Sequence, residues 1–328
     1  MTFLWDGLRH HSPTDLMTKV KASPMIRHFL DLKDFDKDQL TKMLTYGVEM
    51  RRALKSGNSH DMPLQNKHVA MIFEKNSTRT RVSFEVGISQ LGGTPVVLST
   101  NDMQIGRGES IHDTAKVLSG YLDMIMIRCL SHDTLTTLAR YSSVPVINGL
   151  TDRSHPCQVM ADMMTMLDTH GIIEGQIVTW AGDGNNVAVS WIEAAAIMGF
   201  ELRLACPSGY EPPAEIVAWA RDKGADIKLY DELADAADGA HVIVTDVWIS
   251  MGDEEGTRIK DMTPFQVNDA VMAQAAPDAI FMHCLPAIRE MEVTASVIDG
   301  SQSAVWQEAE NRLHAQKAIM AWCAGALD

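Results

Sequence analysis

The sequence has few of the features that mark secreted, membrane-spanning or metal-stapled proteins. Its 328 residues include only five cysteines, an odd number with no C-x-x-C pair. A disulfide framework or a structural zinc site is therefore not expected. The longest apolar run near an end, residues 318–327, is too short to cross a bilayer, and the first residues contain no continuous apolar stretch like that of a secretory signal. We expect a cytoplasmic protein with no membrane partner.

Positive charge is also scarce. The formal net charge is −15 and no basic run is present, so long-range electrostatics disfavour nucleic acid and anionic lipid as partners. An anionic small molecule would need local positive charge, which makes each clustered arginine informative.

Short apolar runs alternate with helical patterns along almost the whole chain. The predicted strands are 69–73, 95–98, 124–127, 144–147, 176–180, 201–205, 226–229, 241–245 and 279–283. The predicted helices are 79–91, 110–121, 132–141, 157–169, 186–198, 214–223, a short one ending at 237, 264–275 and roughly 307–327. Strands separated by helices indicate parallel sheets with right-handed crossovers. The predicted fold class is α/β, with two doubly wound parallel-sheet domains.

The two halves of this pattern meet near Gly171. We expect a first domain at residues 25–171 and a second at 172–312, with the C-terminal helix, residues 313–328, crossing back to the first. Residues 1–24 do not fit the alternation and form an N-terminal extension of unknown role.

The segment Ser77-Thr78-Arg79-Thr80-Arg81 directly follows a predicted strand and opens a helix. A helix start offers free backbone N–H groups and the positive end of the helix dipole, and arginines add guanidinium donors. Ligands in open parallel sheets bind beyond the carboxyl ends of strands, where this segment lies. The motif predicts an anion site, although a capped helix with solvated arginines is the alternative.

Two further segments end at the same sheet edge. Arg128 follows strand 124–127, and His155-Pro156-Cys157-Gln158 follows strand 144–147 and begins a helix. His155 and Gln158 are one helical turn apart and can reach the same point, where a neutral histidine could polarise a carbonyl. Each residue alone is more often a surface arginine or a helix cap.

Together these motifs resemble the aspartate/ornithine carbamoyltransferase family, whose S-T-R-T-R and H-P-x-Q signatures are intact here, and the resemblance runs from about residue 25 to the C-terminus. It implies that the phosphate of carbamoyl phosphate is held by Ser77, Thr78, Arg79, Thr80 and Arg128, with His155 and Gln158 on the carbamoyl group. Gln104 matches a family loop that reaches a neighbouring subunit's site. The resemblance therefore implies a homotrimer, or a multiple of one, with shared active sites.

The second half resembles the family's amino-acid-binding region. The matching segment is Asp246-Val247-Trp248-Ile249-Ser250-Met251-Gly252. The resemblance implies that Asp246 and Ser250 bind the α-ammonium of ornithine. It also implies that Asn186 and the Met251 N–H bind its α-carboxylate. In His283-Cys284-Leu285-Pro286, Cys284 would lie beside the attacking amine and the Leu285 carbonyl would orient the carbamoyl NH₂. Arg312 would reach the carbonyl oxygen. The alternatives are an exposed strand-end turn, a buried cysteine and an ordinary charge near a helix start.

The implied activity is transfer of the carbamoyl group to the δ-amine of L-ornithine, without metal or organic cofactor. The catalytic set would be Cys284, His155, Arg128 and Arg79. Putrescine, N-acylornithine and aspartate are alternative acceptors, and a non-catalytic homologue is a further one. Arginine biosynthesis is the favoured role, with carbamoyl phosphate recovery left open. A nicotinamide dehydrogenase fits poorly, because the glycine turn at Gly182 and Gly184 is followed by Val187 where the dinucleotide fingerprint needs a third glycine.

Overall fold

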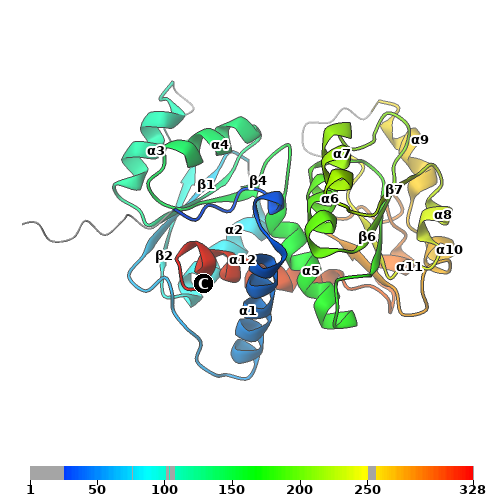
Figure 1. The fold of residues 1–328 in the computed structure, drawn as a ribbon, viewed down its shortest axis with the longest axis horizontal. Coiled ribbons are helices and arrows are strands. Elements are labelled where there is room, and N and C mark those ends of the chain that lie inside the picture. Colours follow the sequence, from blue (N-terminus) through cyan, green and yellow to red (C-terminus); the bar gives the residue numbers. More distant parts are fainter. Residues whose placement is uncertain (1–25, 76, 101–102, 104–107, 250–255, 328) are drawn as a thin grey trace, which may run out of the picture.

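The protein folds into two α/β lobes that lie side by side and are connected by long helices (Figure 1). The structure, a computed structural model, describes residues 26–75, 77–100, 103, 108–249 and 256–327. Each lobe contains one sheet whose strands are all parallel. The predicted fold class is therefore confirmed. Within the described residues, no helix is both long and apolar enough to span a membrane.

The first sheet has the order β2-β1-β3-β4. Its strands are β1 (His68–Phe73), β2 (Thr94–Ser99), β3 (Met124–Arg128) and β4 (Val146–Leu150). The helices of this lobe are α2 (Thr78–Gln90), α3 (Ile111–Ser119) and α4 (His132–Tyr141). β1 and β3 are buried along nearly their whole length, as expected for parallel strands covered on both faces.

The second sheet has the order β7-β6-β5-β8-β9. Its strands are β5 (Ile177–Ala181), β6 (Glu201–Ala205), β7 (Ile227–Tyr230), β8 (Val242–Thr245) and β9 (Ile280–His283). Its helices are α6 (Asn186–Met198), α7 (Ala214–Asp222), α8 (Leu233–Ala237), α9 (Arg258–Met262), α10 (Asp269–Met272) and α11 (Ala295–Ile298).

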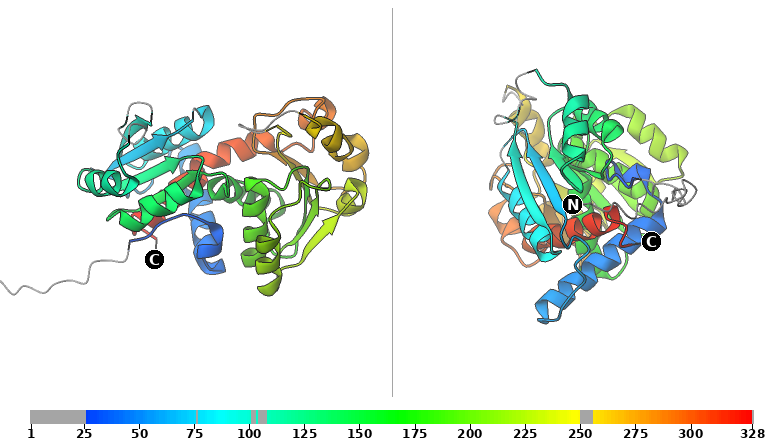
Figure 2. Two further views of the ribbon diagram at one scale, coloured as in Figure 1. Left: turned by 90° about the horizontal axis from the view of Figure 1, so that it is seen from above. Right: turned by 90° about the vertical axis from the view of Figure 1, so that its left-hand side faces the viewer.

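Two long helices join the lobes, α5 (Pro156–His170) and α12 (Val305–Cys323), and a third, α1 (Lys37–Lys55), packs against both. α12 begins beside β9 and packs against α5, α1 and α2, so the end of the chain returns to the first lobe as predicted (Figures 1 and 2). One hydrophobic cluster contains Met71 of β1, Trp180 of β5, Met164 of α5 and Met320 of α12. The two sheets therefore share a continuous apolar core.

The strand orders place one topological switch point in each sheet. In the first sheet the chain leaves β1 toward β2 and then crosses to β3, so the crevice lies between the carboxyl ends of β1 and β3. In the second sheet the corresponding crevice lies between β5 and β8. Ligands of doubly wound sheets bind at such points.

The largest error in the predicted elements is the helix 264–275, which is wrong. The structure instead has α9, a 3₁₀ turn at Thr263–Phe265, and α10. Gln266 is extended, Val267 forms a parallel bridge with Val293, and the Asn268 side chain caps α10. Tertiary pairing of Val267 thus interrupts a segment whose apolar spacing fits one helix. β4 begins two residues later than predicted, α12 ends at Cys323, and α1 and α11 are additions to the predicted set.

Candidate active site

A cavity of about 750 Å³ opens where the two switch points face each other. Its lining includes the ends of β1, β3, β5 and β8, the start of α5, and a residue of α12. Twelve of the predicted site residues line it: Ser77, Thr78, Arg79, Thr80, Arg128, His155, Gln158, Asn186, Asp246, Cys284, Leu285 and Arg312. The remaining three, Gln104, Ser250 and Met251, lie outside the described residues.

The anion-binding motif forms the first turn of α2. Ser77 is the N-cap with extended backbone, and among the described residues its side chain makes no capping hydrogen bond. Thr78 and Arg79 are exposed to the cavity side, while Thr80 is buried. The helix start therefore offers backbone N–H groups and a free hydroxyl to a ligand.

Two arginines meet at Thr80. Arg128 Nη1 lies 3.2 Å and Arg312 Nη2 lies 2.9 Å from Thr80 Oγ1, and both guanidinium groups donate to this oxygen. Burial, together with the charges of Arg312 and Arg79, lowers the pKa of Arg128 to about 10. Three guanidinium groups therefore lie close together in a partly buried corner, and a bound anion would relieve their mutual repulsion.

His155 is a buried, neutral imidazole beside this cluster. Burial, followed by the charges of Arg312 and Arg128, lowers its pKa well below the ordinary value. Its backbone N–H donates to Ser190 Oγ at 2.8 Å, and Pro156 occupies the first turn of α5. Within the described residues, His155 Nδ1 is buried without a hydrogen-bond partner. Since His155 also lines the cavity, its ring lies within reach of a bound ligand.

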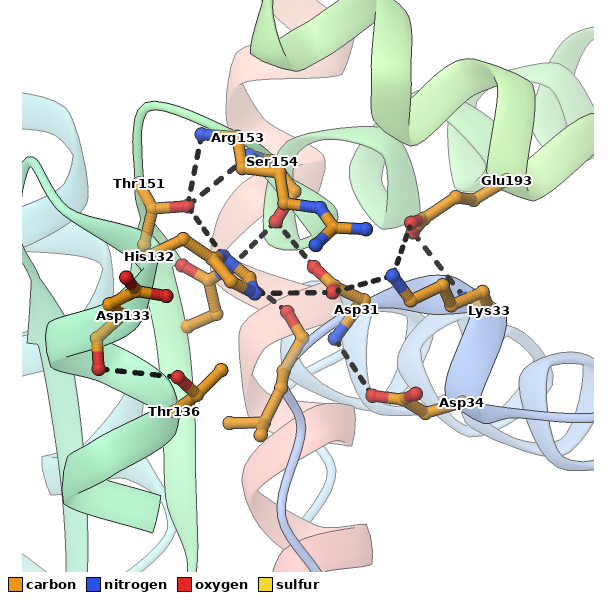
Figure 3. A network of polar contacts seen from close by, with 12 residues as sticks. Asp31, Lys33, Asp34, His132, Asp133, Thr136, Thr151, Arg153, Ser154 and Glu193 are labelled. Carbon is orange, nitrogen blue, oxygen red and sulfur yellow. Dashed lines mark hydrogen bonds and ion pairs between the residues drawn. The ribbon is translucent and has the colours of Figure 1, made fainter. Parts of the chain in front are cut away.

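A buried polar network holds the loop that carries His155 in place (Figure 3). Ser154 donates to Asp31 Oδ1 at 2.5 Å, and Asn148 donates to Ser154 at 3.0 Å. His132 lies 3.0 Å from Thr151 Oγ1 and 3.4 Å from the Asp31 carboxylate. Although burial alone would raise it, hydrogen bonds from His132 and Ser154 bring the pKa of Asp31 down to about 2.

The same network reaches the second lobe through Glu193 of α6. Its carboxylate accepts the backbone N–H groups of Leu32 and Lys33 at 3.0 and 3.4 Å. The ammonium of Lys33 lies between Asp31 and Glu193, 3.4 and 3.7 Å away (Figure 3). Burial and the charge of Asp31 raise the pKa of Glu193 to about 8. Residues 31–33, loop 151–155 and α6 are thus held together behind the cavity.

The opposite wall is acidic. Asp246 follows β8 and accepts hydrogen bonds from Asn185 Nδ2 at 2.8 Å and from the Cys284 thiol at 3.0 Å. Burial and the charge of Asp246 raise the pKa of Cys284 well above its usual range. Cys284 is therefore a neutral thiol, which does not suit a nucleophilic role.

Asn186 and Leu285 complete the lining of the second lobe. Asn186 Nδ2 donates to the Thr151 carbonyl at 2.6 Å, which ties α6 to the His155 loop. Leu285 adopts a φ of +56°, and its N–H donates to His283 Nδ1 at 2.9 Å.

Asp246, His283 and Cys284 each present one atom within 4.8 Å of the others, a spacing that a metal ion could use. However, His283 Nδ1 accepts the Leu285 N–H and Nε2 lies 3.1 Å from Glu292, so both ring nitrogens already have protein partners. The sequence-based expectation that no metal is needed stays a prediction.

Several residues of the site were missed in the sequence. Lys75, Asp152 and Asn185 line the cavity, and Asp162 and Glu308 lie directly beneath it, both bonded to Gln158. A signal existed for Asp162, an acid that interrupts the apolar run of residues 159–164 in the helix Pro156–His170. Such an acid needs a buried partner.

The glycine turn after β5 has a packing explanation. A Cβ on Gly184 would lie 2.2 Å from the nitrogen of Pro212, so this position requires glycine for close approach of two chain segments. Asp183 of the same turn pairs with Arg258. These contacts account for the turn without a dinucleotide.

The fold and the cavity define a two-domain α/β protein that binds small charged molecules between its domains. Residues 27–168 match the carbamoyl-P binding domain of aspartate/ornithine carbamoyltransferase, and residues 174–323 match the Asp/Orn binding domain. The chain belongs to the aspartate/ornithine carbamoyltransferase family.

Individual relatives agree. An ornithine carbamoyltransferase from Rhizorhabdus wittichii is 54% identical over 308 residues, covering 92% of this chain and 100% of the relative. The structure of ornithine carbamoyltransferase from Pyrococcus furiosus has 46% identity and a TM-score of 0.88, covering 94% of this chain and 100% of that chain. The anabolic ornithine carbamoyltransferase from Campylobacter jejuni has 38% identity and a TM-score of 0.86, covering 92% and 100%.

Proposed function

We propose that the protein transfers the carbamoyl group of carbamoyl phosphate to the δ-amine of L-ornithine, giving L-citrulline and phosphate. The observation that carries this proposal is the charge division of the cavity. Arg79, Arg128 and Arg312 line one wall, and Asp246 lines the other. A doubly negative phosphate ester fits the first wall, and an α-ammonium group fits the second.

In this proposal the phosphate is bound by the start of α2 and the two arginines that meet at Thr80. Ser77, Thr78, Arg79 and Thr80 supply backbone and hydroxyl donors, and Arg128 supplies a guanidinium fork. The neutral His155 ring and Arg312 polarise the carbonyl oxygen. Gln158, Cys284 and Leu285 surround the carbamoyl group.

Ornithine is bound by the second lobe. Asp246 takes the α-ammonium and Asn186 takes the α-carboxylate, which leaves the side chain directed toward Cys284. Ser250 and the Met251 N–H are proposed to complete this subsite. An aspartate substrate would bring a second carboxylate toward Asp246, which electrostatics disfavour.

The attacking amine must be neutral. An alkylamine with an ordinary pKa of about 10.4 is neutral roughly once in a thousand molecules, or less, near pH 7. Its nitrogen attacks the carbonyl carbon, and the resulting oxyanion is stabilised by the fixed donors of His155, Arg312 and Thr80. The carbon–oxygen bond to phosphate then breaks, and the amine proton passes to the departing phosphate. The rate should increase as pH rises above neutrality.

The same proposal includes the domain roles and the assembly. We assign residues 25–171 with 313–328 to carbamoyl phosphate and 172–312 to ornithine, in line with the descriptions of the matched family models. We further propose a cytoplasmic homotrimer, with Gln104 reaching a neighbouring site. A role in arginine biosynthesis is supported by the anabolic designation of the Campylobacter jejuni relative.

Product formation with ornithine, putrescine and aspartate, measured side by side with carbamoyl phosphate, tests the proposal. Citrulline should form at a rate at least about a hundredfold above the other two products, because only ornithine satisfies both charged subsites. Equal or faster use of putrescine would reject the assignment of Asp246 and Asn186, and no product with any amine would reject the activity.

A further inference from the structure

Two carboxyl groups lie in the interior directly beneath the cavity. Asp162 on α5 and Glu308 on α12 are each only 1% exposed, and their side chains share a hydrogen bond. Burial raises the pKa of Asp162 to about 7, and burial together with Asp162 raises the pKa of Glu308 well above its usual range. Both carboxyl groups therefore favour their protonated forms more strongly than exposed carboxyl groups do.

Both carboxyl groups bind the side-chain amide of Gln158. Gln158 Nε2 donates to Asp162 Oδ1 at 2.8 Å and to Glu308 Oε1 at 2.9 Å. An amide nitrogen has two hydrogens, so both are used in the interior. On its other side, Gln158 Oε1 accepts from Arg312 Nη1 at 2.8 Å.

These contacts allow only one orientation of the Gln158 amide. If the amide were rotated by half a turn, its NH₂ would face the guanidinium of Arg312 and its oxygen would face two carboxyl acceptors. The contact between two donors at Arg312 is repulsive in a low-dielectric interior, and Gln158 would lose both hydrogen bonds that it donates to the carboxyl groups. The only hydrogen bond that the Gln158 side chain can still make with a ligand is thus one that Oε1 accepts through its second lone pair.

Glu308 also binds the backbone at the end of β9, next to the part of the cavity wall that Cys284 and Leu285 form. Its Oε2 accepts the backbone N–H of His283 at 2.8 Å, at the carboxyl end of β9. His283 in turn accepts the N–H of Leu285 through Nδ1. The carboxyl pair therefore joins α5, α12 and the loop that carries Cys284 and Leu285.

We propose that Asp162 and Glu308 are positioning residues that fix Gln158 as a hydrogen-bond acceptor and thereby make the site select a carbamoyl phosphate over an acetyl phosphate. The selection follows from the group attached to the carbonyl carbon. A carbamoyl NH₂ donates to Gln158 Oε1, whereas an acetyl CH₃ leaves that oxygen without a partner. This inference rests on the proposed function.

Two isosteric variants of the full-length protein separate this role from a packing role. In Asp162→Asn, the new amide oxygen accepts from Gln158 and the new NH₂ donates to Glu308, so every donor keeps an acceptor. In Glu308→Gln, the new NH₂ must face either the His283 N–H or the Gln158 NH₂, so Gln158 loses its enforced orientation. Each variant replaces one carboxyl by an amide and serves as the matched control for the other.

Calorimetry with carbamoyl phosphate, acetyl phosphate and inorganic phosphate provides the readout. Glu308→Gln should weaken carbamoyl phosphate binding about tenfold or more and change acetyl phosphate and phosphate binding less than about threefold. Asp162→Asn should retain the wild-type ratio of the carbamoyl and acetyl phosphate dissociation constants within about threefold. The proposal would be overturned if Glu308→Gln weakened the binding of all three ligands equally. It would also be overturned if folded Asp162→Asn no longer preferred carbamoyl phosphate over acetyl phosphate.

Thermal denaturation checks folding of each variant. If Glu308→Gln does not fold, Asp162→Leu replaces it. Leucine removes one Gln158 acceptor and should reduce the preference for carbamoyl phosphate over acetyl phosphate that Asp162→Asn keeps. The readout is binding and does not depend on turnover. A wild-type protein that prefers carbamoyl phosphate over acetyl phosphate but makes no citrulline would therefore refute the proposed reaction and leave this inference standing. A wild-type protein that binds both acyl phosphates equally would refute this inference alone.

Discussion

Arg312 Nη2 lies 2.9 Å from Thr80 Oγ1, although 232 residues separate them in the chain. This contact joins the C-terminal helix α12 to the first turn of α2, where the anion-binding motif lies. Arg128 donates to the same oxygen. The Thr80 hydroxyl is therefore the point at which three segments of the cavity wall are aligned.

Removing that hydroxyl should weaken the anion site. Thr80→Val keeps the shape of the side chain but leaves two guanidinium groups without their shared acceptor. Hydrogen bonds to charged groups contribute about 1.5–3 kcal/mol, so the dissociation constant for carbamoyl phosphate should rise about tenfold or more. Calorimetry measures it. Thr80→Ser retains the hydroxyl and should stay within about threefold of wild type; similar losses in both variants would contradict the hydrogen-bond explanation.

The two arginines of the motif should differ sharply. Arg79 lines the cavity, whereas Arg81 is exposed and lies 3.5 Å from Glu85 one turn along the helix. Arg79→Ala should reduce kcat/KM at least about a hundredfold, because it removes a charge that stabilises the phosphate in the transition state. Arg81→Ala should change it less than about threefold, since exposed ion pairs contribute little. Steady-state kinetics decide, and an unchanged rate in Arg79→Ala would exclude Arg79 from the site.

Cys284 should resist alkylation near neutral pH. Burial and Asp246 raise its pKa well above the ordinary range, so almost no thiolate is present. Labelling by iodoacetamide at pH 8, followed by peptide mass mapping, should be slow at this cysteine. Asp246→Asn removes the nearby negative charge and should increase the labelling rate about tenfold. Rapid labelling of the wild type would show that Cys284 is a reactive thiolate.

Glu193 should make stability depend on pH. The folded carboxyl keeps its proton up to about pH 8, whereas the unfolded one loses it near its ordinary value of 4.5. Between these values the folded state binds more protons, so this group lowers stability as pH rises. Burial is the main cause of the raised pKa; the charge of Asp31 adds to it, and the charges of Lys33 and Arg153 oppose it.

Glu193→Gln removes this titration while its amide oxygen still accepts the Leu32 and Lys33 N–H groups. The variant should lose less Tm than wild type between pH 5 and pH 9, with a difference of at least about 2 °C at pH 9. Differential scanning fluorimetry across this range provides the test. Glu174→Gln, an exposed partner of Lys37, is the matched control and should follow the wild-type curve. Parallel curves for Glu193→Gln and wild type would refute the assignment.

Most of the fold could be predicted because parallel β/α units carry their signals locally. Buried strands appear as apolar runs, and turns and helix starts appear as motifs directly after them, so helices 132–141 and 186–198 were predicted to the residue. The prediction of a helix at 264–275 was wrong because Val267 forms a bridge with Val293, a residue of a distant strand-like segment. A local pattern contains no record of that partner.

The sequence by itself determined the S-T-R-T-R and H-P-x-Q segments, their places after strands, and the acidic residue after β8. Only the tertiary structure decided that Arg312 reaches Thr80, that Asp162 and Glu308 both bind Gln158 beneath the cavity, and that Asp31 holds the His155 loop through Ser154. The physical reason is the separation along the chain of the residues that interact. Helix starts and strand ends are set by neighbouring residues, whereas a buried charge depends on partners that only chain folding brings within hydrogen-bond distance.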